Sequence, residues 1–283
     1  MNAISPRACV IGWPITHSRS PLIHKYWLNH HGLAGSYERV PVEPENLNKF
    51  FDLVRAGSFV GCNVTLPHKQ AATAYIDHAD ERVRRIGALN TVWREGDFLH
   101  ATSTDGPGYA SNLLAEHPDF RFDGTKICVL GAGGSARSIV DELLRRSASR
   151  IIVHNRTQSR ATELALHFGK GVLACDRTEL PARLQEVDLV INTTSAGIGN
   201  SDKIEIPWHS VPSDAIISDI SYVPLVTPFL KEAAQNGHRI STGLGMLLHQ
   251  AVLGFEKWFG VRPEVTPELY ALVARDIDPD FQP

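Results

Sequence analysis

A glycine-rich segment at residues 126–137 has the clearest pattern for chemistry in this chain. The apolar residues 127–130 predict a buried strand, and Gly131-Ala132-Gly133-Gly134-Ser135-Ala136 follows directly, matching G-x-G-x-x-G/A. Glycines here let the backbone approach a pyrophosphate, and the N–H groups at the start of the next helix can bind it. We therefore predict a dinucleotide site. The alternative is a tight strand-to-helix turn without a ligand.

A basic segment, Asn155-Arg156-Thr157-Gln158-Ser159-Arg160, follows the next predicted strand. A site for NAD usually has Asp or Glu in this region to bind the ribose 2′-hydroxyl, and neither is present. Asn155, Arg156, Thr157 and Arg160 instead offer donors and positive charge, which suit a 2′-phosphate. The alternative, a solvated basic helix start, is disfavoured by the helix dipole. We therefore predict NADP rather than NAD as the cofactor.

The first part of the chain contains further polar residues near predicted helix starts. Ser18 and Ser20 precede Pro21, and their hydroxyls together with free N–H groups could hold a carboxylate. The alternative is that Ser20 serves only as the N-cap of the helix. Lys69 is predicted in the first turn of a helix that starts at Pro67. By residue type alone, an isolated lysine is expected to be a surface group.

The segments that position these residues alternate between strands and helices, which predicts an α/β fold. Before residue 105 we predict strands at 8–11, 37–42 and 59–64, a hairpin of 89–93 with 98–101, and helices at 20–31, 46–55 and from 67. After residue 108 we predict a helix at 109–114 and strands near 127–130, 151–154, 172–174, 189–191, 216–219 and 239–241. This second series predicts a doubly wound parallel sheet of the Rossmann type. Residues 246–259 and 267–276 are predicted to be helical.

Composition limits the classes of function. The 283 residues exceed the usual size of one core, so two domains are expected. The net charge of −3, with scattered signs, gives no support for a nucleic-acid or membrane partner, so a small molecule is expected. The cysteines are widely spaced and predict buried, reduced thiols rather than disulfides or a metal site. The spacing of the cysteines and histidines predicts no metal site. Because the sequence has no long apolar segment, we also expect a cytoplasmic protein.

Taken together, the motifs resemble those of the shikimate dehydrogenase family over nearly the whole chain. The motifs that carry the resemblance are Gly12-x-Pro14-Ile-x-His17-Ser18-x-Ser20-Pro21-x-x-His24, Gly61-x-Asn63-Val64-Thr65-x-Pro67-x-Lys69, Gly87-Ala88-x-Asn90-Thr91, Thr104-Asp105-Gly106, the Gly131 and Asn155 segments, and Gly243-Leu-Gly245-Met246-Leu-x-His249-Gln250. They occur in the family's order, and their joint match is highly specific.

The resemblance implies the reversible reduction of 3-dehydroshikimate to shikimate by NADPH, a step of the chorismate pathway to aromatic amino acids. It implies that Lys69 and Asp105 form the catalytic pair. It further implies three groups of binding residues. The substrate carboxylate is held by Ser18, Ser20 and Tyr222. The ring hydroxyls are bound chiefly by Asn63, Thr65, Asn90 and Gln250. Near the cofactor, besides the Gly131 and Asn155 segments, lie Glu81, Thr193, Ile220, Gly243 and Met246.

The family's architecture implies two α/β domains. Residues 1–105 and 244–283 would bind the substrate, and residues 106–243 would form the Rossmann NADP domain. Three positions depart from the family's usual residues: Ser103, Lys25 and Ala101 stand where Asn, Asn and Gly are common. Two alternatives remain, a quinate/shikimate dehydrogenase paralogue and an NADP-sensing regulatory module without catalysis. The oligomeric state is expected to be monomer or homodimer.

Overall fold

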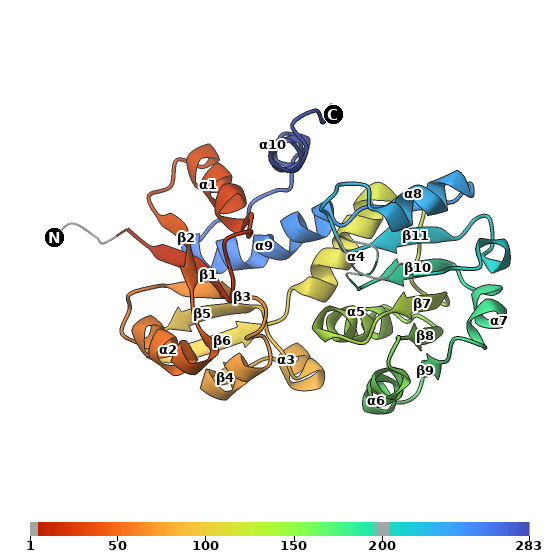
Figure 1. Cartoon of the computed structure of the whole chain (residues 1–283). Coiled ribbons are helices and arrows are strands. Elements are labelled where there is room, and N and C mark those ends of the chain that lie inside the picture. The colour runs from red at the N-terminus through yellow and green to blue at the C-terminus, as the bar shows by residue number, and fades with distance from the viewer. Residues whose placement is uncertain (1–4, 195, 197–203, 283) are drawn as a thin grey trace. The chain divides into compact units, whose positions relative to one another are not determined.

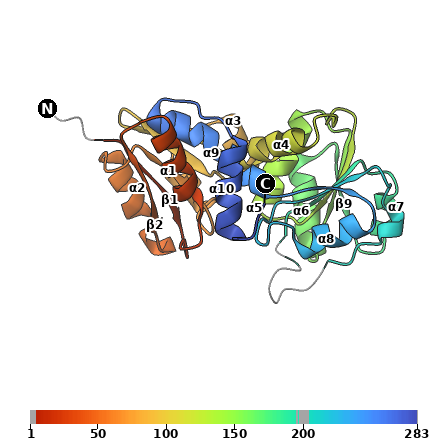
Figure 2. The same ribbon diagram turned by 90° about the horizontal axis from the view of Figure 1, so that it is seen from above.

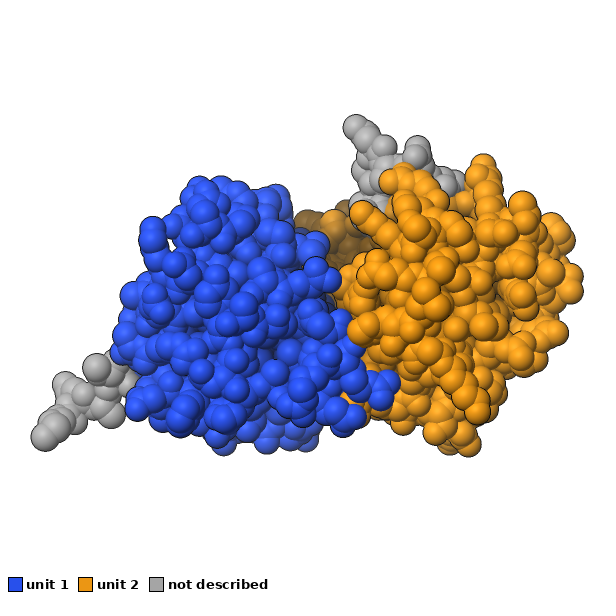
Figure 3. All heavy atoms as spheres, turned by 90° about the horizontal axis from the view of Figure 1, so that it is seen from below, with its two compact units in different colours: residues 1–108, 247–273, 282–283 blue, residues 109–246, 274–281 orange. Residues whose placement is uncertain are grey.

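The computed structural model describes residues 5–194, 196 and 204–282, and the chain divides into two compact units (Figures 1 and 3). Unit 1 comprises residues 1–108, 247–273 and 282–283, and unit 2 comprises residues 109–246 and 274–281. Helices α4 (Asp105–Glu116), α9 (Leu244–Phe259) and α10 (Pro267–Ile277) each contain residues of both units. Residues 274–281 therefore group with unit 2, whereas the sequence analysis placed them with the N-terminal domain.

Unit 1 is built on a mixed six-stranded sheet in the order β2-β1-β3-β5-β6-β4. Its strands are β1 (Arg7–Gly12), β2 (Ser36–Pro41), β3 (Gly61–Val64), β4 (His78–Ala79), β5 (Thr91–Glu95) and β6 (Phe98–Thr102). β1 runs parallel to β2 and β3, whereas β5 is antiparallel to β3 and β6. The predicted hairpin is present: Glu95 pairs with Phe98, and Gly96 has φ +61° in the turn.

The helical elements of unit 1 are α1 (Ser20–His30), α2 (Leu47–Arg55), α3 (Glu81–Ile86), the 3₁₀ helices η1 (Pro44–Asn46) and η2 (Ala71–Tyr75), and most of α9. Trp258 of α9 packs directly onto the sheet, where its Nε1 donates to the carbonyl of Val92 at 2.9 Å. A Cβ atom on Gly61 would lie 2.1 Å from that Nε1, so only glycine permits this approach. Helix α9, from the C-terminal part of the chain, therefore packs against the N-terminal sheet.

Unit 2 is built on an all-parallel six-stranded sheet in the order β12-β11-β10-β7-β8-β9. Its strands are β7 (Lys126–Leu130), β8 (Arg150–His154), β9 (Val172–Cys175), β10 (Leu189–Asn192), β11 (Ile216–Asp219) and β12 (Arg239–Ser241). Its helical elements besides α4 are α5 (Gly134–Arg145), α6 (Gln158–Phe168), α7 (Leu180–Leu184), α8 (Pro228–Gln235) and the 3₁₀ helix η3 (Trp208–Ser210). The predicted Rossmann-type sheet is thus confirmed.

Both faces of this sheet are covered by helices, which explains its continuous apolar strands. Ile127 and Val129 belong to a buried cluster with α4, α5 and α6, whereas their neighbours Cys128 and Leu130 belong to a cluster with α7 and α8. Figure 2 shows α4 and α8 on opposite sides of the sheet. The strand order reverses direction between β7 and β10, and ligands of such sheets bind outside the carboxyl ends of the strands at that point.

Among the helices that the structure describes, none is long and apolar enough to cross a membrane.

Candidate active site

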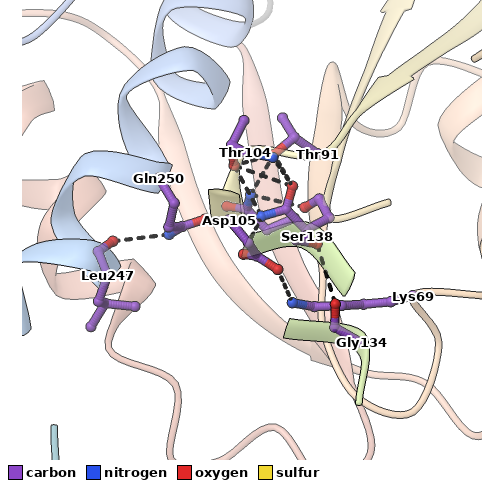
Figure 4. Close-up of polar contacts among 10 residues, drawn as sticks. Lys69, Thr91, Thr104, Asp105, Gly134, Ser138, Leu247 and Gln250 are labelled. Atoms are coloured by element: carbon purple, nitrogen blue, oxygen red, sulfur yellow. Dashed lines mark hydrogen bonds and ion pairs between the residues drawn. The ribbon is translucent and has the colours of Figure 1, made fainter. Parts of the chain in front are cut away.

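Lys69 and Asp105 form an ion pair in unit 1. The Nζ and Oδ2 atoms are 2.5 Å apart, and Figure 4 shows the two side chains pointing toward each other. Lys69 lies in the turn after β3, and Asp105 is the first residue of α4. The side chains are only 18% and 9% exposed, so solvent screens their attraction weakly. The remaining exposure leaves the ammonium group able to contact a small ligand.

The local structure around Lys69 differs from the prediction of a helix starting at Pro67. Residues 66–70 form turns, and the following element is the 3₁₀ helix η2 rather than an α-helix. The Lys69 carbonyl accepts the N–H of Leu89 at 2.9 Å. This bond ties the turn to the segment that precedes β5. Lys69 is therefore held by long-range pairing.

Asn90 lies at the centre of the hydrogen bonds around Asp105. Its Nδ2 donates to Asp105 Oδ1 at 2.8 Å and to Thr104 Oγ1 at 2.9 Å, and lies 3.3 Å from Gln250 Oε1. Its Oδ1 accepts the backbone N–H of Thr104 at 2.8 Å. Since an N–H can only donate, the oxygen must face Thr104 and the nitrogen must face Asp105. The structure therefore brings four predicted site residues together: Lys69, Asp105, Asn90 and Gln250.

Two further predicted residues, Asn63 and Thr65, lie at the end of β3. Asn63 is buried, its Oδ1 accepts from the Tyr37 hydroxyl at 2.6 Å, and its Nδ2 lies 3.1 Å from the carbonyl oxygen of Asn90 and 3.3 Å from Thr91 Oγ1. Both amide hydrogens are therefore used within the protein, which leaves a lone pair on Oδ1 for a ligand. Thr65 follows Asn63 by two residues and is partly exposed.

Ser18 and Ser20 lie at the start of α1. The helix begins at Ser20 with Arg19 as its N-cap, and the Arg19 side chain makes no capping hydrogen bond. The prediction that Ser20 caps the helix is therefore wrong: Ser20 lies within the first turn, and its own N–H donates to Ser18 Oγ at 3.4 Å. The Arg39 guanidinium holds the loop by donating to the Ser18 carbonyl at 2.7 Å. Ser18 Oγ accepts the N–H of Ser20, so its own hydrogen remains able to donate to an anion, whereas Ser20 is buried and its side chain is hydrogen-bonded to Tyr37.

The glycine loop in unit 2 has the geometry of a phosphate-binding turn. Gly131 has φ +112°, and a Cβ atom there would lie 2.4 Å from Thr193 Oγ1. At Gly133 and Gly134, in contrast, a Cβ atom would meet no described atom within 4 Å. Gly133 is the N-cap of α5 and offers no side-chain acceptor, so the first N–H groups of this helix are available to a ligand. These residues fit the pyrophosphate of a dinucleotide.

The other residues of this loop have different environments. Ala132 and Ser135 are partly exposed beside the open space. Ala136 is fully buried in the cluster beneath α5, where the small third residue of the fingerprint lets the helix pack closely on the sheet.

The basic segment follows β8, directly beside the glycine loop in the sheet order. Arg156, Thr157 and Arg160 are exposed, and Asn155 Nδ2 donates to the carbonyl of Thr157 at 2.9 Å. Thr157 is the N-cap of α6, whose first turn contains no acidic residue. The segment therefore presents positive charge at the amino end of a helix, as a 2′-phosphate site requires.

The remaining predicted residues lie as follows. Thr193, Ile220 and Gly243 come just after the carboxyl ends of β10, β11 and β12, and a Cβ atom on Gly243 would lie 2.4 Å from the Ile220 carbonyl oxygen. Tyr222 lies in the loop after β11 and is partly buried, and Met246 is buried in the first turn of α9. Glu81 is exposed in the first turn of α3, in unit 1.

Sequence reasoning missed Asp219, a buried carboxylate at the end of β11. Its Oδ2 accepts from Asn192 at 3.0 Å and from Thr227 at 2.8 Å, and its Oδ1 accepts the N–H of Ser221 at 2.9 Å. Burial raises the pKa of Asp219, and these hydrogen bonds oppose the rise. The signal in the sequence that could have identified Asp219 is an acidic residue at the end of an apolar strand. Asp219 holds the loop that carries Tyr222.

Fold and site together define the class of protein: a two-unit α/β oxidoreductase that uses a nicotinamide dinucleotide. The parallel sheet has the glycine turn that is typical of dinucleotide-binding folds, and the Lys69–Asp105 ion pair offers an ammonium group that is chemically able to donate a proton. Comparison with known proteins then identifies the family. The chain belongs to the shikimate dehydrogenase family.

Three family descriptions match successive parts of the chain. Residues 10–92 match the shikimate dehydrogenase substrate binding domain, residues 113–233 match shikimate / quinate 5-dehydrogenase, and residues 243–267 match the shikimate 5′-dehydrogenase C-terminal domain. The shikimate dehydrogenase (NADP(+)) of Methylocella silvestris is 46% identical over 278 residues, which cover 98% of this chain and 99% of the relative.

Solved structures of related dehydrogenases are similar to this chain as well. Shikimate 5-dehydrogenase from Thermus thermophilus, in complex with NADP(H) and shikimate, is 35% identical with a TM-score of 0.84, covering 96% of this chain and 99% of that one. Quinate dehydrogenase from Corynebacterium glutamicum, in complex with NAD, is 25% identical with a TM-score of 0.86, covering 95% and 98%. The chain is similar to both over nearly its whole length.

Proposed function

We propose that this chain reduces 3-dehydroshikimate reversibly to shikimate with NADPH, with Lys69 and Asp105 as the catalytic pair. The chain is an NADP-dependent shikimate dehydrogenase, an oxidoreductase of aromatic amino-acid biosynthesis, as its near full-length relatives indicate. The observation that carries the residue assignment is the 2.5 Å ion pair, in which Asn90 binds the second oxygen of Asp105.

The chemistry explains these residue types. NADPH, when bound, supplies the hydride. Reduction of a ketone builds negative charge on its oxygen, and the Lys69 ammonium stabilises that charge and donates the proton. Asp105 orients the ammonium through Oδ2 and accepts a hydrogen bond from a neighbouring substrate hydroxyl. Asn90 holds Oδ1, so the carboxylate cannot rotate away from Lys69.

We assign substrate binding to seven further side chains. The carboxylate is held by Ser18, Ser20 and Tyr222. The ring hydroxyls are bound by Asn63, Thr65, Asn90 and Gln250. We assign residues 1–105 and 244–283 to the substrate domain, apart from residues 274–281, which group with unit 2, and we assign residues 106–243 to the NADP domain.

The NADP domain binds its cofactor at the carboxyl ends of the parallel strands. The pyrophosphate lies on the glycine loop, residues 131–136, and the 2′-phosphate lies on Asn155, Arg156, Thr157 and Arg160. Residues near the rest of the cofactor are Glu81, Thr193, Ile220, Gly243 and Met246. The open space beside Gly133 and Gly134 and the uncapped start of α5 support this assignment.

Ser18→Ala is expected to weaken substrate binding while leaving the KM for NADP unchanged. The hydroxyl is a donor to the substrate carboxylate, and its loss should cost about 1–3 kcal/mol, seen as a higher KM for shikimate. Ser58→Ala, which removes an exposed hydroxyl in the same unit, is the matched control. A higher KM for NADP with an unchanged KM for shikimate would show that Ser18 is not at the carboxylate.

A second candidate function is that of a quinate/shikimate dehydrogenase paralogue. It is favoured by the similarity to the quinate dehydrogenase of Corynebacterium glutamicum. Quinate carries an additional hydroxyl on the carbon that bears the carboxylate, so the space beside Ser18 and Ser20 should decide between the two substrates.

A direct assay tests the proposal. The purified protein is incubated with shikimate or quinate and with NADP or NAD, and nicotinamide reduction is followed by absorbance. We expect the highest kcat/KM with shikimate and NADP. A higher value with quinate would identify the paralogue. Binding of NADP without turnover of either acid would identify the non-catalytic sensing module, for which the Lys69–Asp105 pair would have no purpose.

The cysteines indicate the cellular compartment of the protein. Cys9, Cys62, Cys128 and Cys175 are buried and free, and burial raises the pKa of each thiol, so they fit a reducing compartment. We therefore place the protein in the cytoplasm, as a monomer or homodimer that binds only small molecules. Sedimentation at assay concentration measures the oligomeric state.

A further inference from the structure

Tyr37 is tied to the candidate site by a hydrogen bond whose direction is determined. The residue lies on β2, is 8% exposed, and its hydroxyl is 2.6 Å from Asn63 Oδ1. On the other side of the same amide, Asn63 Nδ2 lies 3.1 Å from the carbonyl oxygen of Asn90. Because a carbonyl oxygen only accepts, the nitrogen of Asn63 must face Asn90 and the oxygen must face Tyr37. Tyr37 is therefore the donor.

The hydrogen bonds continue in one direction to the catalytic pair. Asn63 Nδ2 lies 3.3 Å from Thr91 Oγ1, which donates to Asn90 Oδ1 at 3.1 Å. Asn90 Nδ2 in turn donates to Asp105 Oδ1 at 2.8 Å. Two backbone groups also orient this relay: the Asn90 carbonyl faces Asn63 Nδ2, and the Thr104 N–H faces Asn90 Oδ1. Buried networks of this kind specify one arrangement only when every member is satisfied.

The Tyr37 ring is itself held in place. His24 of α1 stacks on it with ring centroids 3.8 Å apart and an interplanar angle of 10°, and Trp258 of α9 lies 5.7 Å away at a tilt. Burial lowers the pKa of His24 to about 3 and raises that of Tyr37 well above its usual value. Both side chains are therefore uncharged at neutral pH, and the Tyr37 hydroxyl keeps its proton.

We propose that Tyr37 is a positioning residue for catalysis. By donating to Asn63, it sets the orientation of a relay of Asn63, Thr91 and Asn90, and this relay holds Asp105 in the rotamer that pairs with Lys69. The Tyr37 hydroxyl also has a side-chain hydrogen bond with Ser20, which opposes the rise of its pKa on burial. The proposal rests on the assigned roles of Lys69 and Asp105. Loss of the hydroxyl leaves Asn63 Oδ1 buried without its donor, so the amide is held only through the contacts of its Nδ2 with Asn90 and Thr91.

The test compares Tyr37→Phe with Tyr26→Phe. Both remove one tyrosine hydroxyl from unit 1, but the Tyr26 hydroxyl lies 3.4 Å from Thr266 Oγ1 and is not part of the relay. We expect Tyr37→Phe to lower kcat by about fivefold to fiftyfold, with the KM for NADP unchanged. This range corresponds to the free-energy cost of leaving one buried acceptor unpaired. Tyr26→Phe should leave kcat at the wild-type value. Equal kcat in both variants would overturn the proposal.

A double-mutant cycle separates positioning from general loss of stability. In an Asn63→Ala background the relay is already broken, so Tyr37→Phe should have no further effect on kcat, whereas independent effects would multiply and contradict the proposal. If Asn63→Ala fails to fold, Thr91→Val, which breaks the same relay, takes the place of Asn63→Ala as the background. Lys69→Ala is measured alongside to separate the role of Lys69 from the positioning role of Tyr37. An inactive Lys69→Ala with a fully active Tyr37→Phe would overturn the role of Tyr37 alone.

Discussion

Lys69→Ala is expected to lower kcat by about 10²–10⁴-fold, the usual contribution of a positioned proton donor. The ammonium lies 2.5 Å from Asp105 Oδ2 in a largely buried setting, so water cannot take its place in the same geometry. The KM for shikimate should change much less, because several other groups bind the substrate. Steady-state kinetics in both directions of the reaction measure the two effects separately.

Lys49→Ala is the control for this substitution. Lys49 is an exposed lysine of unit 1 whose Nζ donates to Asn46 Oδ1 at 3.0 Å, away from the ion pair. It should retain wild-type kcat. If Lys69→Ala also retained near-normal kcat while folding normally, Lys69 would have no part in proton transfer.

The unmodified enzyme should prefer NADP to NAD by about tenfold to a thousandfold in kcat/KM. A 2′-phosphate held by Arg156 or Arg160 gains charge-assisted hydrogen bonds of about 1.5–3 kcal/mol each. NAD leaves the same exposed arginines solvated, so it should bind weakly without being excluded. Arg156→Ala should therefore raise the KM for NADP and leave kcat almost unchanged.

Arg150→Ala is the matched control for the cofactor prediction, because Arg150 begins the strand that Arg156 follows and is also exposed. It should leave the KM for NADP unchanged. Salt adds a second measurement: the preference for NADP should fall as ionic strength rises, since the phosphate contacts are exposed. Equal kcat/KM for the two cofactors in the unmodified enzyme would contradict our assignment of the Arg156 segment.

The sequence by itself determined the features that depend on neighbouring residues. The strand, glycine turn and helix around Gly131 formed as predicted, because apolar periodicity and backbone freedom act over a few residues. The hairpin at Gly96 and the basic helix start at residues 155–160 depend on equally local signals. For the same reason the alternation of strands and helices predicted two α/β units and the parallel sheet of the second.

The roles of Lys69 and Asp105 came from the sequence only through family resemblance, because residue type and spacing gave no reason to pair them. Only the tertiary structure placed the two side chains in contact. The turn that carries Lys69 illustrates the cause. Its carbonyl pairs with Leu89, outside the turn, and the chain continues into a 3₁₀ helix rather than the α-helix expected from Pro67. Ser20 likewise lies inside α1 rather than at its cap.

The tertiary structure also decided which polar groups reinforce the site. Tyr37 meets Asn63 because β2 and β3 flank β1 in the sheet, and Asp219 meets Asn192 because β10 and β11 are neighbours. The sequence contains these side chains but not their partners. Strand order and register result from burying both faces of a sheet at once, which involves every segment of a unit. Local patterns therefore predicted the elements and the cofactor loop, whereas the hydrogen-bond network around Asp105 exists only in the folded chain.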